Sequence, residues 1–105
     1  MNEKRKPSHD LEAFKRFAAD GERFTATATA RRSARRLGFR DDDIKQALQS
    51  LQRWHFYKSM TSYSDHRQWQ DVYHLPSAAG MLYVKFTDDV LAEFLLLSFK
   101  EKDDG

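Results

Sequence analysis

Residues 56–73 read FYKSMTSYSDHRQWQDVY and decide how the chain is interpreted. The runs 54–61 and 67–73 are rich in aromatic, β-branched and hydroxyl side chains, which pleated sheets favour. The polar segment 62–66 is the expected turn between them. Because the stretch has almost no simple aliphatic residues, it predicts a hairpin with a polar outer face rather than a buried core segment.

Rings and cations are interleaved along this hairpin. Such surfaces are typical of proteins that bind single-stranded nucleic acid, because bases stack on rings while phosphates meet positive charge. The rings are Tyr57, Tyr63, Trp69 and Tyr73, and the cations are Lys58, Arg67 and, when protonated, His66. Two exposed antiparallel strands with a polar face would have the same composition, so composition alone leaves both interpretations open.

The C-terminal part of the chain continues in extended patterns. The segment 75–80 (LPSAAG) is a turn signal, with Pro and Gly as punctuation. Residues 81–86 alternate, which predicts Leu82, Val84 and Phe86 on the core face and Tyr83 and Lys85 on the other.

The run 91–100 suits a helix or a strand by periodicity, and we interpret it as a strand from about Phe94. Strict alternation then predicts that Leu95, Leu97 and Phe99 join the core, with Leu96, Ser98 and Lys100 opposite.

The N-terminal half has helical patterns. A loose lead-in is expected at 1–7, a helix at 10–20, a short strand at 23–27, a helix capped by Thr29 and ending at Leu37, and a helix beginning at Asp41. The whole chain, 1–105, is therefore predicted to be a single α+β domain with N-terminal helices packed on one face of a mostly antiparallel sheet.

Composition excludes several classes of function. Without cysteine there are no disulfides and no thiolate zinc sites. No apolar run approaches the roughly 20 residues of a membrane span, and the N-terminus lacks the apolar centre of a secretory signal, so we expect a cytoplasmic protein. The acidic triplet 41–43 suits a helix start better than a metal, and the histidines lack ligand spacing with acids. We expect no metal and no cofactor.

The hairpin stretch, followed by LYVKF (82–86) and LLLSFKEK (95–102), resembles the motility quorum-sensing regulator (MqsR) toxins of bacteria, as does the opening EKRKP (3–7). The resemblance implies a RelE-like toxin fold and a metal-independent mRNA interferase, an endoribonuclease that cuts single-stranded mRNA at GCU-type sites and leaves a cyclic phosphate and a 5′-hydroxyl. It also implies a cognate antitoxin, usually a zinc-binding, DNA-binding repressor, within a type II toxin–antitoxin module.

The residue types suit such chemistry. RNA supplies its own nucleophile, so a ribonuclease must orient the 2′-hydroxyl, accept its proton, stabilise charge on phosphorus and protonate the leaving oxygen. Free lysine and tyrosine titrate near roughly 10 and are poor bases at neutral pH. We therefore interpret Lys58 and Lys100 as charge stabilisers, Tyr83 as a proton carrier and Gln70 as a positioning group. The resemblance points to the same four residues.

Five further residues are expected to bind RNA: Tyr57, Met60, Tyr73, His74 and Lys85. The chain departs from the family after the WQDVY tyrosine, where members often have Arg-Pro and this sequence has His74, Leu75 and Pro76. His74 supplies a cation only when protonated. The alternative is a non-catalytic RNA-binding or partner-binding module with the same basic, aromatic face.

Overall fold

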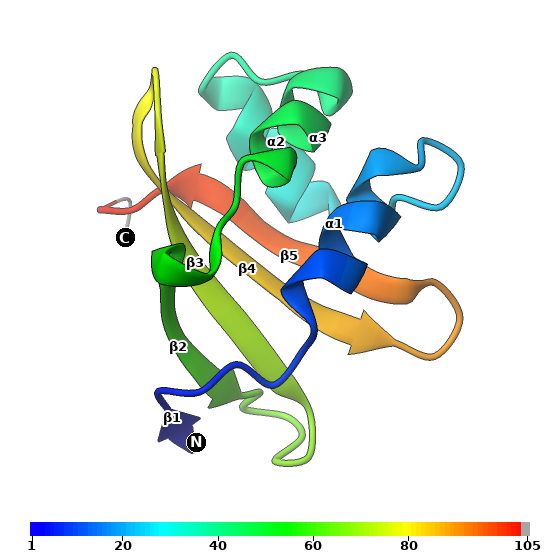
Figure 1. Cartoon of the computed structure of the whole chain (residues 1–105), viewed down its shortest axis with the longest axis vertical. Helices are drawn as coiled ribbons and strands as arrows, with labels where there is room; N and C mark the ends of the chain where they lie inside the picture. The colour runs from blue at the N-terminus through cyan, green and yellow to red at the C-terminus, as the bar shows by residue number, and fades with distance from the viewer. Residues whose placement is uncertain (104–105) are drawn as a thin grey trace.

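The computed structural model describes residues 1–103 and has the expected α+β architecture. Within these residues, three helices precede most of a five-stranded antiparallel sheet of order β1-β2-β3-β4-β5, and Figure 1 shows them gathered on one side of it. The elements are β1 (Glu3–Lys4), α1 (Leu11–Ala19), α2 (Ala28–Arg36), α3 (Asp41–Gln49), a 3₁₀ turn (Arg53–His55), β2 (Phe56–Thr61), β3 (Trp69–Ser77), β4 (Gly80–Asp89) and β5 (Glu93–Glu101).

The helices begin where side chains satisfy their first N–H groups. The Asp10 carboxylate accepts the Ala13 N–H at 3.1 Å, and the Thr27 hydroxyl accepts the Ala30 N–H at 3.0 Å. The cap of α2 is therefore Thr27 and not Thr29. The expected strand 23–27 is reduced to a single bridge between Ala26 and Leu96 of β5. In this bridge the Leu96 N–H donates to the Thr25 carbonyl, and the Thr27 N–H donates to the Leu96 carbonyl.

The core lies between the helices and the inner face of β3, β4 and β5. The rings of Phe14 and Phe86 lie parallel, with centroids 3.7 Å apart, and Phe94 meets the Phe14 ring edge-on at 5.6 Å. Leu82 and Val84 are also fully buried, which confirms the alternation predicted for 81–86.

The prediction for β5 was partly wrong because this strand contains an irregularity. Lys85 pairs with Ser98 while the next residue, Phe86, pairs with Leu96, so Leu97 is an extra residue. The alternation therefore changes phase. Phe94 and Leu96 are buried, whereas Leu95 and Leu97, predicted to be in the core, are only partly buried. Beyond the irregularity Phe99 is buried, as predicted.

The turn between β3 and β4 is shorter than expected. β3 continues through Ser77, and the turn expected over 75–80 is confined to Ala78 and Ala79 before β4 begins at Gly80. Gly80 has φ of +99°, a conformation that other residues rarely adopt.

The N-terminal lead-in is ordered, contrary to expectation. β1 pairs with β2, and the Asn2 carbonyl accepts the Thr61 N–H at 2.9 Å. Farther along, the buried Asp71 carboxylate accepts the N–H groups of Ser8 (3.0 Å) and His9 (2.9 Å). These bonds fix the segment along the edge of the sheet, which brings residues 3–5 beside β2.

Candidate active site

The sheet face opposite the helices, called the outer face below, carries all four predicted catalytic residues. Their positions follow from strand register: Tyr83 lies between His74 and Lys100, Lys58 is opposite Val72, and Gln70 is opposite Met60. Neighbouring strands are about 4.8 Å apart, so these side chains form short rows across the sheet. The outer face includes Glu3, Tyr57, Lys58, Met60, Gln70, Val72, His74, Tyr83, Lys85, Ser98 and Lys100.

One row is aromatic and ends in a cation. The Tyr57 ring stacks on His74 with centroids 4.3 Å apart, and His74 lies 6.2 Å from the Tyr83 ring. The Lys100 ammonium stands 5.4 Å from the centre of the Tyr83 ring. Tyr57 is 40% exposed. The row therefore offers flat surfaces for bases and a charge for phosphate on one accessible strip.

The adjacent row is basic. Val72 belongs to the outer face, yet it is fully buried between Lys58 and Lys85, its partners on the two neighbouring strands. Burial lowers the pKa of Lys85, and the charges of Lys100 and Lys58 lower it further. Lys58 behaves oppositely: its hydrogen bond to Glu3 raises its pKa, so this ammonium is held in the charged form.

Burial also sets the protonation of Tyr83 and His74. It raises the pKa of Tyr83, which keeps the hydroxyl protonated and suits it to donate a proton rather than accept one. Burial, followed by the charge of Lys102, lowers the pKa of His74 below its ordinary value. The imidazole is therefore neutral at neutral pH and does not replace the charge of an arginine.

Tyr73 does not belong to the outer face, and the prediction that it contacts RNA is corrected. It is fully buried and packs edge-on against Phe56, with ring centroids 5.5 Å apart. Neighbouring residues of a strand point to opposite faces, so Tyr73 and His74 cannot both face outward. Within residues 1–103 the Tyr73 hydroxyl has no hydrogen-bond partner.

Sequence reasoning missed Glu3. Its carboxylate accepts a hydrogen bond from the Lys58 ammonium at 2.8 Å, and this bond lowers the pKa of Glu3. The side chain is 45% exposed. The motif EKRKP was noticed, but a two-residue strand whose partner lies 55 residues away has no local signature.

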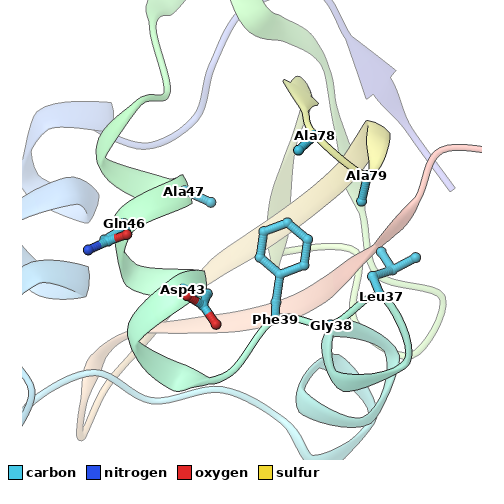
Figure 2. A pocket seen from close by; sticks show the side chains of 8 residues that line it. All are labelled: Leu37, Gly38, Phe39, Asp43, Gln46, Ala47, Ala78 and Ala79. Atoms are coloured by element: carbon cyan, nitrogen blue, oxygen red, sulfur yellow. The ribbon is translucent and has the colours of Figure 1, made fainter.

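A hollow of about 630 Å³ lies on the helix side and not on the outer face. Figure 2 shows its lining side chains, which come from α3, the segment before α3 and the β3–β4 turn. Its one carboxylate, Asp43, accepts the Arg40 N–H at 2.8 Å and so helps to cap the start of α3. The arginines of α2 are also away from the outer face, and Arg31 and Arg35 bind Asp41 at 2.6 and 3.1 Å.

Residues 1–103 contain neither a cluster of metal ligands nor a helix that could span a membrane. No cluster of three or more histidine, aspartate or glutamate side chains has an arrangement that could hold a metal ion. No helix in this range has the length and apolar character needed to cross a membrane.

Comparisons with known proteins identify the family of this chain. Residues 6–101 match the family described as motility quorum-sensing regulator, toxin of MqsA. The mRNA interferase toxin MqsR of Escherichia coli (strain K12) is 41% identical over 100 residues, which cover 95% of this chain and 99% of that protein. The resemblance noted in the sequence is thus confirmed, and this chain belongs to the motility quorum-sensing regulator toxin family.

Proposed function

We propose that this chain is an mRNA interferase toxin, an endoribonuclease that cuts single-stranded mRNA without a metal by using the 2′-hydroxyl of the substrate. The observation that carries the proposal is the convergence of Lys58, Tyr83 and Lys100 with Gln70 on one accessible face. The name of the Escherichia coli relative supports the reaction class.

Each residue has a role that fits its surroundings. Lys58 and Lys100 stabilise the extra negative charge on phosphorus in the transition state. Tyr83, whose pKa is raised by burial, donates a proton to the departing 5′-oxygen. Gln70 orients the scissile nucleotide. The products are a 2′,3′-cyclic phosphate and a 5′-hydroxyl.

The RNA strand lies along the aromatic row. Tyr57 and His74 stack with bases, Lys85 meets the backbone, and Met60 contacts the nucleotide beside Gln70. Cleavage falls at GCU-type sites. In the cytoplasm, where mRNA is the target, a cognate antitoxin that binds zinc and represses its own operon neutralises the toxin.

The test is cleavage of a mixed-sequence RNA in chelator, with the new 5′ ends mapped. Wild-type protein is expected to make discrete cuts, and Lys58→Ala and Lys100→Ala should each slow cleavage by about 10²–10³-fold, because a donor to the developing charge is lost. Lys45→Ala, on α3 beside Asp42, is the matched control and should cut normally.

Three outcomes contradict parts of the proposal. Loss of cutting in chelator removes the metal-independent claim. Continued cutting of an RNA whose scissile nucleotide is 2′-deoxy removes the 2′-hydroxyl mechanism. Binding of RNA without any cutting, with an affinity that falls as salt rises, supports a non-catalytic binding module.

A further inference from the structure

The proposed reaction needs a group that accepts the 2′-proton, and the roles proposed for Lys58, Lys100, Tyr83 and Gln70 leave that task unassigned. Lys58 and Tyr83 both have raised pKa values and hold their protons at neutral pH. Gln70 has no basic atom of suitable strength. An acceptor must therefore come from elsewhere on the outer face.

We propose that Glu3 is the general base that removes the 2′-proton of the RNA. Its carboxylate lies on the outer face, 2.8 Å from the Lys58 ammonium, and its strand position is opposite Met60, which is itself opposite Gln70. This inference rests on the proposed 2′-hydroxyl mechanism and adds the one missing role.

The register places Glu3 in the same row as Gln70. Residues directly opposite one another on an antiparallel pair share a face, so Glu3, Met60 and Gln70 form a line across β1, β2 and β3. Lys58 lies beside this line and binds the carboxylate. A ribose held by Gln70 and a phosphate held by Lys58 would place the 2′-hydroxyl beside Glu3.

The carboxylate is charged and one of its oxygens is available. The charged and titratable groups that face it are Lys58, Arg5 and Tyr83, and the hydrogen bond and charge of Lys58 lower the pKa of Glu3. Lys58 is hydrogen-bonded to the Oε2 atom, and for the other oxygen no hydrogen bond is found among residues 1–103. The carboxylate is therefore ionised at neutral pH, and its second oxygen can accept a hydrogen bond from a bound 2′-hydroxyl.

The position of Glu3 does not depend on its own side chain. β1 is held by the backbone bond from Thr61 to Asn2 and by the Arg5 guanidinium, which donates to the Tyr57 carbonyl at 3.1 Å. Asp71 fixes the chain farther on, at Ser8. A substitution at Glu3 therefore changes the chemistry of the side chain while the strand stays in place.

The step balances without any external reactant. The 2′-oxygen forms a bond to phosphorus as its proton moves to the Glu3 carboxylate, and the bond from phosphorus to the 5′-oxygen breaks. Tyr83 donates a proton to the departing 5′-oxygen. Proton exchange with water then returns Glu3 and Tyr83 to their starting states.

The first experiment compares single-turnover cleavage by wild type, Glu3→Gln and the matched control Glu12→Gln, an exposed carboxylate of α1. Glutamine keeps an oxygen that can accept the Lys58 hydrogen bond but cannot take up a proton. Glu3→Gln should therefore bind RNA normally and cut about 10²–10⁴-fold more slowly, whereas Glu12→Gln should match wild type. Cleavage by Glu3→Gln within threefold of wild type overturns the proposal.

The second experiment separates a base from a residue that merely positions Lys58. The rate of wild type should fall on the acidic side as Glu3 becomes protonated, and this acid limb should vanish in Glu3→Gln. Added formate should partly restore cleavage by Glu3→Ala. If the acid limb persists in Glu3→Gln, or disappears instead in His74→Gln or Lys85→Met, another residue is the base and the proposal fails.

Failure of this inference is distinguishable from failure of the proposed function. If the 2′-deoxy substrate is still cut, the mechanism itself is wrong. If that substrate resists cutting while Glu3→Gln is fully active, the mechanism stands and only the role of Glu3 is removed.

Discussion

The two faces of one sheet differ in what their side chains do. The inner face is made of rings and aliphatic groups in close contact, with Phe86 parallel to Phe14 at 3.7 Å. The outer face carries lysines, two tyrosines and a carboxylate, and its one fully buried aliphatic side chain, Val72, is flanked by Lys58 and Lys85. Because neighbouring residues of a strand alternate between the faces, a shift of one position separates a structural role from a chemical one.

The division predicts unequal effects on stability for substitutions at Phe86 and Lys85, which are adjacent in β4. Phe86→Ala should lower the free energy of unfolding by about 3–5 kcal/mol, because it removes the ring packed on Phe14 and leaves a cavity. Lys85→Met should change it by much less, since methionine keeps most of the apolar stem. Urea unfolding of both variants measures the difference.

Equal losses of stability in the two variants would contradict this division. If Phe86→Ala does not fold, Phe86→Leu replaces it, because a smaller loss of volume leaves the domain intact while the order of the two effects is kept.

The inner face could largely be predicted from sequence. In 82–86 aliphatic or aromatic core residues alternate with Tyr83 and Lys85, so the period of two can be recognised in the sequence. In 94–99 the period of two cannot be recognised, because three successive leucines do not indicate which of them is the extra residue. The same period, applied at Tyr73 and His74, would have placed Tyr73 in the core.

Residues of the outer face could be predicted where their strand has a sequence pattern that can be recognised. Lys58 and Gln70 follow from the hairpin and Tyr83 from the alternating strand, while Lys100 lies in the less regular β5, and the register brings all four to one face. Glu3 could not be found in this way. Its strand has two residues, and its placement depends on bonds to Thr61 and Asp71 that join segments far apart in the sequence.

A smaller effect is expected at His74, within the aromatic row of the outer face. The lowered pKa means that His74 is neutral at pH 7.5 and gains charge only as the pH falls below its ordinary value of 6.5. His74→Arg adds a charge at every pH, so RNA affinity should rise several-fold at pH 7.5 and less at pH 5.5. Fluorescence anisotropy with an uncleavable 2′-deoxy-substituted RNA measures both values.

Salt dependence provides the control for that prediction. One added phosphate contact should steepen the dependence of log affinity on log salt by about 0.7 at pH 7.5, whereas His74→Gln should leave the slope unchanged at that pH. An equal increase in RNA affinity for His74→Arg at both pH values would contradict this expectation, because it would mean that His74 is still uncharged at pH 5.5.

The smallest effect is expected at Tyr73, where a substitution should raise the free energy of unfolding instead of lowering it as Phe86→Ala does. Its hydroxyl is buried without a partner in the described part of the chain, and burial, followed by the nearby Asp71 carboxylate, raises its pKa. Tyr73→Phe removes an unsatisfied polar group and keeps the ring beside Phe56, so the free energy of unfolding should rise by about 1 kcal/mol. Cleavage should be unchanged, because the side chain faces the helices. A loss of RNA affinity in Tyr73→Phe would instead mean that the ring reaches the outer face when RNA binds, and the separation of the two faces would not hold at β3.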